Sequence, residues 1–324
     1  MKSYTLRVEG TLAVLESVDA PTPTAGPGQV LLKMHAAGLN RGEFIPGGLI
    51  KGNASKPAGM EGAGEVVALG AGVTGVQLGQ RVMGRCPGAF SEYAVMDARE
   101  ALPVPAGLSM EAAAAVPLTF LVVHDMLVLQ GQLQPGQWLL ITGVSSGVGV
   151  AALQSAKALG AKVIGTSGSA EKLARLKGLG LDVAIHTRDP NFAAQVLDAT
   201  GAAGANLVVN TVGGTVFAEC MRCMAFEGRL ATVGYVDNTM KAELDIQALH
   251  VQRLTLFGVS NKQRNADQRA AGVPAFVADL MPALADGRIQ PLVDRVFPFA
   301  ELPAAKAHME ANRHLGKIVL KIAG

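Results

Sequence analysis

The 324-residue chain has little charge, few aromatic residues and only three cysteines. Charged residues make up 17% and aromatic residues 4%, whereas 49% of the residues are hydrophobic. A disordered chain would need the opposite balance, with low hydrophobicity and high charge. The 28 basic residues nearly balance the 26 acidic ones, and a net charge of +2 gives no strong basic field for nucleic acid. The composition predicts a globular protein of about two domains.

The cysteines Cys86, Cys220 and Cys223 are too few, and odd in number, to form a disulfide framework. The last two form a Cys-x-x-Cys pair on the apolar face of a predicted helix, together with Phe217 and Met224. A redox-active pair of this kind would normally lie at an exposed helix N-terminus. We therefore predict two buried core cysteines.

No long hydrophobic run is present. The most apolar stretch, Ala112–Leu129, is interrupted by Pro117, Thr119 and Asp125, so it falls short of the ~18–20 apolar residues that span a bilayer. The N-terminal sequence MKSYTLRVEG carries charge and lacks the apolar core of a secretory signal. We predict a buried helix at Ala112–Leu129, no membrane partner and a cytoplasmic protein.

Residues 1–100 contain short segments with the period-2 pattern of β-strands, bounded by glycine and proline. In Gln29–Gly38, for example, Val30, Leu32 and Met34 fall on one face. The other candidate strands here are Glu65–Leu69 and Glu92–Met96. This pattern predicts an antiparallel β domain.

After residue 260 we expect a long helical stretch, Ala266–Asp286, and short strands around Val296 and at Ile318–Ile322. These last 60 residues are too few to form a domain alone. We expect them to return to the first domain.

From about residue 137, apolar strands alternate with helices. The predicted strands are Trp138–Thr142, Lys162–Thr166, Asp182–His186, Ala205–Asn210, Arg229–Gly234 and Leu254–Val259. The predicted helices are Gly147–Leu159, Ala170–Leu179, Asn191–Ala199, Thr215–Ala225 and Ile246–Gln252. Because strands that are apolar throughout are typical of a parallel sheet buried on both faces, we predict a doubly wound α/β fold.

The first of these strands is followed by Gly147-x-Gly149-x-x-Ala152, which opens the first helix. This is the position of the dinucleotide fingerprint, in which the glycines allow a tight turn and a close approach of the backbone to a pyrophosphate. The free N–H groups at the helix N-terminus would bind the phosphates. The alternative is a helix packed tightly on the sheet without a ligand.

The second strand indicates which dinucleotide is bound. Sites for NAD usually end this strand with an acidic residue that binds the ribose 2′-hydroxyl. Here the strand runs into Ser167-Gly-Ser169, and Lys172 and Arg175 follow on the next helix. Small hydroxyls and a cation suit a 2′-phosphate, so we favour NADPH. The alternative is that Lys172 and Arg175 only cover an exposed helix face.

Seven motifs in the order Ala37–Glu43, Gly59–Gly64, Val116–Thr119, Ser145–Gly149, Gln154-x-x-Lys157, Gly160–Thr166 and His314–Leu320 are distributed over the whole chain. By these motifs the chain resembles the zinc-independent quinone oxidoreductase (zeta-crystallin-like) branch of the medium-chain dehydrogenase/reductase superfamily. The resemblance implies a GroES-like, β-rich catalytic domain at 1–117, a Rossmann NADP-binding domain at 118–260 and a return to the catalytic domain at 261–324. It also implies a homodimer, in which Leu254–Val259 would pair across a two-fold axis.

The resemblance further implies which residues bind the cofactor. Asn40 would lie near the nicotinamide ribose, and Ser167 and Lys172 would bind the 2′-phosphate. The full set is Asn40, Ser145, Ser146, Gly147, Val148, Gly149, Ser167, Lys172, Asn210, Gly234, Tyr235, Ser260 and Arg313. The chain departs from the family at Val144, where a small residue is common. It also has Phe44, Ile45 and Ile50 in a segment where quinone reductases often carry tyrosines.

Zinc-dependent relatives hold their metal with a cysteine, the histidine of a Gly-His-Glu motif and a later cysteine or aspartate. In this chain the cysteine position falls in Gly38–Asn40, which has no cysteine, and Met60 replaces the histidine. A methionine thioether does not suit Zn²⁺ beside carboxylates. We predict no metal site.

Without zinc, the hydride must go to a small acceptor that is already electron-poor. We predict a quinone, with an enone or enal as the first alternative and a low-activity NADPH-binding structural or RNA-binding protein as the second. Asn40 and Arg41 could stabilise the developing oxyanion. The alternative for Arg41 is a surface charge. Segment 42–56 and the 261–268 loop would shape the acceptor pocket, and the sequence does not choose between acceptors.

Overall fold

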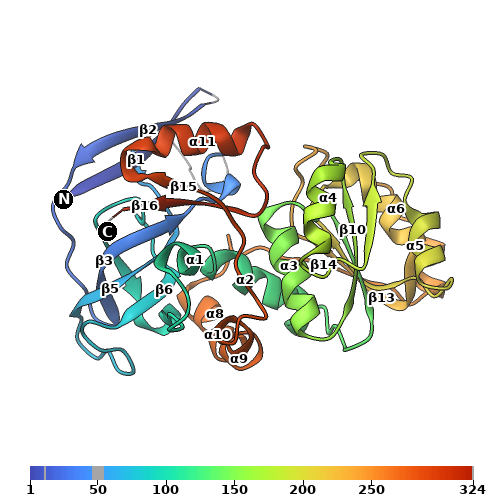
Figure 1. Cartoon of the computed structure of the whole chain (residues 1–324), viewed down its shortest axis with the longest axis horizontal. Helices are drawn as coiled ribbons and strands as arrows, with labels where there is room; N and C mark the ends of the chain where they lie inside the picture. The colour runs from blue at the N-terminus through green and yellow to red at the C-terminus, as the bar shows by residue number, and fades with distance from the viewer. Residues whose placement is uncertain (11, 46–54, 323–324) are drawn as a thin grey trace. The chain divides into compact units, whose positions relative to one another are not determined.

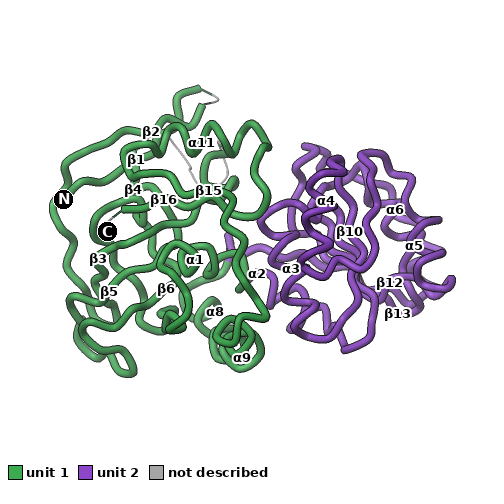
Figure 2. The backbone as a smooth tube through the Cα atoms, viewed as in Figure 1, with its two compact units in different colours: residues 1–121, 264–324 green, residues 122–263 purple. Residues whose placement is uncertain are grey.

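The computed structural model describes residues 1–10, 12–45 and 55–322. Ile50 and most of the predicted pocket segment 42–56 lie outside the described residues. The chain divides into two compact units (Figure 2). Unit 1 comprises residues 1–121 and 264–324, and unit 2 comprises residues 122–263. The predicted domain limits stay a prediction, since a compact unit need not coincide with a domain.

Unit 1 is built on two β-sheets. The smaller sheet has the order β2 (Leu12–Asp19), β1 (Lys2–Glu9) and β4 (Lys56–Pro57). The larger sheet has the order β15 (Val293–Pro298), β16 (Lys317–Lys321), β3 (Gln29–Gly38), β5 (Glu61–Leu69), β6 (Arg81–Arg85) and β8 (Leu102–Pro103), and β7 (Tyr93–Asp97) also pairs with β3. All pairs are antiparallel except β15 with β16. The predicted β-rich, GroES-like domain is confirmed.

The end of the chain joins the sheet formed by its beginning. β16 pairs with β3, with Leu320 opposite Ala37. Val30, Leu32 and Met34 of β3 are fully buried, as is Ala36 on the other face. The strand that carries the chain into the Asn40 region is therefore held from both sides.

The predicted helical stretch at about Ala266–Asp286 is helical but is broken into separate helices. The segment forms three short helices, α8 (Ala266–Ala270), α9 (Val273–Asp279) and α10 (Met281–Ala285). Pro274 and Pro282 lie in the first turns of α9 and α10. Because proline has no N–H and clashes with the preceding turn, it can begin a helix but not continue one. A further helix, α11 (Leu302–Glu310), precedes β16.

The apolar stretch Ala112–Leu129 is also broken. It forms α1 (Met110–Ala114), α2 (Pro117–His124) and a π-helical turn (Asp125–Leu129). Most of its side chains are buried, as predicted. Among the residues that the structure describes, no helix has the length and apolarity needed to cross a membrane.

Unit 2 contains one parallel sheet of six strands. Their order is β11 (Val183–His186), β10 (Lys162–Ser167), β9 (Trp138–Thr142), β12 (Ala205–Asn210), β13 (Met224–Thr232) and β14 (Thr255–Gly258). Helices α3 (Gly147–Ala158) and α4 (Ala170–Lys177) cover one face, and α5 (Ala193–Ala199) and α6 (Phe217–Arg222) cover the other (Figure 1). A last helix, α7 (Ile246–Val251), precedes β14. The doubly wound Rossmann sheet is confirmed.

The strand order reverses between β9 and β12. The chain moves outward from β9 through β10 to β11 and then crosses to β12 on the other side. In open parallel sheets, ligands bind outside the carboxyl ends of the strands at this switch point. The fold therefore places the fingerprint loop after β9 at the expected binding position.

The cysteines of the Cys-x-x-Cys pair are buried and reduced. Cys220 and Cys223 are fully buried in an apolar cluster that includes Leu140, Phe192 and Val208. Burial raises the pKa of the Cys223 thiol to about 12, so the thiolate does not form at neutral pH. The prediction of two core cysteines is confirmed.

Candidate functional site

The loop between β9 and α3 brings free backbone N–H groups to the end of the sheet. Ser146 caps α3, and its Oγ accepts a hydrogen bond from the Gly149 N–H at 3.0 Å. The N–H groups of Gly147 and Val148, in the same turn, have no intrahelical acceptor. A Cβ atom at Gly149 would lie 2.6 Å from the carbonyl oxygen of Val144. Only glycine therefore lets the helix begin so close to the strand, and the resulting N-terminus suits an anion.

The family departure at Val144 is compensated by a second residue. Val144 is fully buried, and a Cβ atom at Gly165 would lie 2.7 Å from Val144 Cγ1. The valine side chain thus occupies the space that a side chain on β10 would fill. The larger residue leaves the loop geometry intact.

Serine hydroxyls meet at the carboxyl ends of β9 and β10. Ser145 Oγ and Ser167 Oγ are 3.1 Å apart, and the Ser169 N–H donates to Ser167 Oγ at 3.3 Å. Ser169 also caps α4 by accepting a hydrogen bond from the Lys172 N–H. The structure therefore brings together the side chains of Ser145 and Ser167, with the backbone of Lys172 in the first turn of α4, and the loop between β10 and α4 carries no carboxylate.

An arginine that the sequence analysis did not single out lies over this loop. A Cβ atom at Gly168 would lie 2.4 Å from Arg188 Nε and 2.9 Å from Arg188 Cζ, so the guanidinium covers the glycine. Arg188 is exposed and follows β11, where His186 pairs with Ser167 of β10. Arg188 could have been predicted here from the sequence, because residues that follow neighbouring parallel strands lie at the same edge of the sheet. A guanidinium plane beside two hydroxyls matches a 2′-phosphate, so the residues fit NADPH.

Asn210 orders the turn after β12. It is fully buried; its Nδ2 donates to the Gly213 carbonyl at 2.9 Å, and its Oδ1 accepts from Thr142 Oγ1 and from the Val212 and Gly213 N–H groups. The Asn210 amide is therefore engaged within the turn. That Asn210 helps to bind the cofactor stays a prediction, and it would do so by fixing the shape of this turn.

The remaining predicted cofactor residues lie on exposed or half-exposed surface. Tyr235 and the half-buried Gly234 follow β13, and Ser260 follows β14. Ser260 Oγ accepts a hydrogen bond from the Lys262 N–H at 3.3 Å. Arg313 is exposed after α11 in unit 1. Their contacts with a cofactor stay predictions.

Asn40 belongs to a polar cluster in unit 1. Its Nδ2 donates to Glu43 Oε1 and to Glu61 Oε1, both at 2.8 Å, and its Oδ1 accepts from Lys317 Nζ at 2.7 Å. Both amide N–H groups are therefore in use. To donate to an acceptor oxygen, as the sequence analysis proposed, Asn40 would have to give up one of these bonds.

Lys317 and Glu61 form a buried ion pair at the centre of this cluster. Their Nζ and Oε1 atoms are 2.7 Å apart, and the side chains are 8% and 0% exposed. Lys317 also donates to the Leu39 carbonyl at 3.0 Å, and Glu61 Oε2 accepts from the Leu118 N–H at 2.7 Å. The sequence analysis missed this pair because its members are 256 residues apart.

The same residues decide whether zinc fits. The cysteine position of zinc-dependent relatives falls within Gly38–Asn40, and the Lys317 ammonium is bonded to both Asn40 and Glu61. Across residues 1–10, 12–45 and 55–322, no three histidine, cysteine or acidic side chains form a metal-binding group. A fixed positive charge among amide and carboxylate oxygens does not suit Zn²⁺, which prefers nitrogen and sulfur ligands.

Arg41 binds the end of a helix. Its Nη2 donates to the Met309 carbonyl at 2.8 Å and to Asn312 Oδ1 at 2.6 Å. Met309 lies in the last turn of α11, where carbonyl groups lack intrahelical partners and favour a cation. Arg41 therefore fastens α11 to the segment after β3. Its catalytic role stays a prediction.

Glu43 is buried and protonated at neutral pH. Burial raises its pKa to about 8, and the charge of Glu61 contributes further. Its Oε2 atom is buried without a hydrogen-bond partner among the described residues, so no donor stabilises a charge on this oxygen. The cluster thus contains one carboxylate, one carboxylic acid and one ammonium group, and is neutral overall.

We expect Glu43→Gln to flatten the pH dependence of stability. Between pH 4.5, the ordinary pKa, and about 8, the folded protein keeps a proton that the unfolded chain has released. The free energy of unfolding therefore falls as pH rises through this window, by up to about 1.4 kcal/mol per unit from this group. Glutamine mimics the neutral acid, so urea unfolding should show the variant gaining stability over the wild type from pH 5 to 8.5. The exposed Glu301→Gln is the control, and parallel pH curves for wild type and Glu43→Gln would refute the buried acid.

Family profiles match both units. The profile described as "Alcohol dehydrogenase GroES-like domain" matches residues 26–106, and the one described as "Zinc-binding dehydrogenase" matches residues 147–273. Among curated proteins, the highly reducing polyketide synthase ALT1 of Alternaria alternata is 32% identical over 99% of this chain. The chain spans only 12% of the length of that relative.

Solved structures match over nearly the whole chain. Mycobacterial Rv1454c complexed with NADPH is 29% identical, with a TM-score of 0.88 over 99% of this chain and 100% of that one. An NAD-dependent alcohol dehydrogenase is 29% identical, with a TM-score of 0.86 over 100% of both chains. A quinone oxidoreductase of Pseudomonas syringae pv. Tomato DC3000 is 28% identical, with a TM-score of 0.86 over 99% of both chains.

Proposed function

Because the chain belongs to the medium-chain dehydrogenase/reductase superfamily, in which it resembles the zinc-independent quinone oxidoreductases, we propose that it reduces a quinone with NADPH. The observation that carries this proposal is a cluster of polar side chains at one end of the sheet of unit 2. Ser145, Ser167 and Arg188 meet there at the carboxyl ends of neighbouring strands, without a carboxylate to bind a free ribose 2′-hydroxyl. The NADPH bound to mycobacterial Rv1454c supports the same cofactor.

The polar cluster of unit 1 restricts the acceptor. Bound NADPH supplies the hydride, and a Lewis acid would be needed to activate an ordinary ketone. Since the residues around Asn40 do not fit zinc, the acceptor must already be electron-poor, as quinones are. The quinone oxidoreductase among the similar structures supports this substrate class.

The roles of the chain's own residues follow from their positions. The N–H groups at the start of α3 would bind the pyrophosphate, and Ser167, Arg188 and Lys172 would bind the 2′-phosphate. Lys317 and Glu61 hold the Asn40 amide in one orientation. Because the Asn40 amide is fixed, a cofactor or acceptor that contacts it would be held in one orientation. Solvent would supply the proton that completes the reduction.

An enone or enal is the alternative acceptor. It is favoured by the similarity to a polyketide synthase whose name describes it as highly reducing. An α,β-unsaturated carbonyl meets the same requirement as a quinone, because its β-carbon accepts hydride without a metal. The two proposals differ in the acceptor and share the cofactor.

Initial rates of cofactor oxidation by chelator-treated protein test the proposal. NADPH and NADH are each assayed with 1,4-benzoquinone and with 3-penten-2-one. Faster quinone reduction with NADPH is the expected result, whereas faster enone reduction would favour the alternative. Tight NADPH binding without turnover of either acceptor would favour a low-activity binding protein. Activity that returns only with added zinc would refute the metal-free site.

We further propose that the chain forms a homodimer through β14. This strand lies at the edge of the parallel sheet of unit 2, where unpaired backbone groups can add a second strand. Light scattering should give twice the mass of the chain. Phe257→Lys, which places a charge on this edge, should shift the protein toward monomer, while Val277→Lys on exposed α9 should not. A monomeric wild type would refute the dimer.

A further inference from the structure

Arg85 is a cation for which the structure provides no partner. It ends β6 and is partly buried, and within residues 1–10, 12–45 and 55–322 its guanidinium makes no hydrogen bond, ion pair or ring contact. Burial and the charge of Arg269 both lower its pKa, so its surroundings disfavour the positive charge. A partly desolvated charge without a partner is costly, and proteins usually pair such groups or use them to bind a ligand.

Arg85 lies beside the polar cluster that holds Asn40. In the antiparallel pair of β5 and β6, Arg85 is directly opposite Glu61. Side chains at opposite positions point to the same face of a sheet, with their Cβ atoms about 5 Å apart. The oxygens of Glu61 are bonded to Asn40, to Lys317 and to the Leu118 N–H. The pairing of β5 with β6 therefore places Arg85 next to the cluster, although Glu61 does not bind the Arg85 guanidinium.

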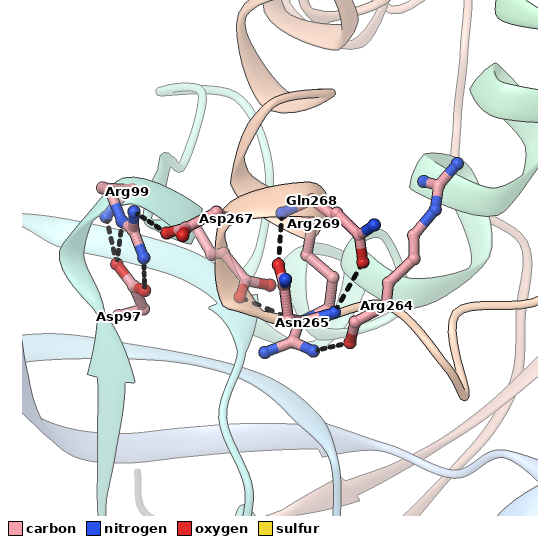
Figure 3. A network of polar contacts seen from close by, with 8 residues as sticks. Asp97, Arg99, Arg264, Asn265, Asp267, Gln268 and Arg269 are labelled. Atoms are coloured by element: carbon pink, nitrogen blue, oxygen red, sulfur yellow. Dashed lines mark hydrogen bonds and ion pairs between the residues drawn. The ribbon is translucent and has the colours of Figure 1, made fainter.

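Glu100, whose charge acts on Arg85, is bound by another arginine, as are Asp97 and Asp267 of the adjoining network. Figure 3 shows Arg99 between Asp97 and Asp267, with N–O distances of 2.7 Å to each. Arg269 Nε lies 3.2 Å from Glu100 Oε1, and the Glu100 side chain is only 4% exposed.

The backbone places β6 against this network. A Cβ atom at Gly84, the residue before Arg85, would lie 2.6 Å from the Glu100 carbonyl oxygen. Arg269 also donates to the Arg264 carbonyl at 2.6 Å. Arg264 belongs to the 261–268 loop that the sequence analysis expects at the acceptor pocket. The charge of Glu100 partly offsets the cost of burying Arg85, but Glu100 is paired with Arg269, and no carboxylate among the described residues binds the Arg85 guanidinium directly.

We propose that Arg85 binds a carboxylate carried by the electron-poor acceptor. This inference rests on the proposed reductase function and narrows its substrate class to acidic quinones or acidic enones. A guanidinium binds a carboxylate through two parallel N–H bonds, which fix orientation as well as affinity. Arg85 would hold the acceptor's acidic end and so direct its reactive bond toward the Asn40 region.

Matched acid and ester acceptors test this role. The enone pair is trans-4-oxo-2-pentenoate and its methyl ester, and the quinone pair is 1,4-naphthoquinone-2-carboxylate and its methyl ester. For the pair that the enzyme reduces, wild type should favour the acid over the ester by at least ~10-fold in kcat/KM. Arg85→Met should lower kcat/KM for the acid by roughly 10–100-fold, mainly through KM, because a charged hydrogen-bond pair is lost. The rate with the ester should stay within ~3-fold.

Two further variants make the result specific. Arg81→Met removes an exposed arginine from the same strand and should leave the acid-to-ester ratio unchanged. Arg85→Lys keeps the charge but loses the planar fork, and should recover part of the preference for the acid. A wild-type enzyme without preference for the acid, or a preference that survives Arg85→Met, would overturn the proposal.

A binding measurement separates this inference from the proposed function. Calorimetric titration with 4-oxopentanoate, which has no reducible double bond, is carried out on protein saturated with NADP⁺. Binding that is lost in Arg85→Met supports the carboxylate site even if no acceptor is turned over, in which case only the reductase proposal fails. Equal binding by wild type and Arg85→Met, or no binding by either, would refute the site while leaving the reductase proposal untouched.

Discussion

Replacing Arg188 with methionine is expected to lower kcat/KM for NADPH by roughly 10–100-fold while leaving kcat/KM for NADH within about 3-fold. The two cofactors differ only in the 2′-phosphate. The Arg188 guanidinium covers Gly168 beside Ser167, at the carboxyl end of β10. Methionine keeps an unbranched, flexible side chain but cannot form charged hydrogen bonds to a phosphate. Steady-state rates with each cofactor, at a saturating concentration of one acceptor, measure the change.

Gly168→Ala provides an independent test of the same contact. The new Cβ atom would lie 2.4 Å from Arg188 Nε, so the guanidinium must move away. We expect the same selective loss of NADPH, although every charge is kept. Arg175→Met removes an exposed arginine from α4 and serves as the control. Equal losses with NADPH and NADH in Arg188→Met would indicate a structural role and contradict the assignment.

Replacing Lys317 with methionine is expected to destabilise unit 1 by about 3–5 kcal/mol. The substitution leaves the Glu61 carboxylate buried, 0% exposed, without its ammonium partner. Asn40 Oδ1 and the Leu39 carbonyl lose their donor at the same time. The expected loss is a large part of the stability of a typical domain. Thermal unfolding and hydrogen exchange of the β3 and β16 amides measure it.

Restoring neutrality should recover part of this loss. In the double variant Glu61→Gln and Lys317→Met, no charge is left unpaired, so we expect it to be more stable than Lys317→Met alone. Lys306→Met removes a half-buried lysine that pairs with the exposed Glu310 four residues away. Such pairs contribute about 0.2–0.5 kcal/mol, and this variant is therefore the control. A loss in Lys317→Met no larger than that in Lys306→Met would contradict the buried pair.

Much of the fold could be predicted from local sequence patterns. The limits of β3, β9 and β12 agree with the prediction to the residue, because alternation in one case and continuous apolar runs in the others mark the strand ends. The turn before α3 was predictable because its glycines meet a steric requirement that no other residue satisfies. The breaks within the helical stretch 266–286 were not predicted, because hydrophobic periodicity alone does not show that Pro274 and Pro282 begin new helices.

The parts of the site that were missed depend on contacts distant in sequence. Lys317 reaches Asn40 across 277 positions, and no local pattern predicts that a lysine near the C-terminus meets a buried glutamate. The hydrogen bonds of the Asn40 amide could not be foreseen for the same reason. Arg188 is closer in sequence to Ser167, but only the parallel register of β10 and β11 shows that the two lie at one edge. The residue types after the second strand suggested the cofactor. Only the pairing of the strands shows which charged side chain lies beside Ser167 and is proposed to bind the 2′-phosphate.

The central claim is that unit 2 binds NADPH through its 2′-phosphate. The most direct measurement is fluorescence titration of the wild-type protein with NADPH and with NADH, without an acceptor. NADPH should bind at least ~10-fold more tightly, since one charged contact to the 2′-phosphate is enough for such a difference. Equal affinities, or tighter binding of NADH, would contradict the assignment of Ser167 and Arg188 and with it the NADPH-dependent function proposed for the chain.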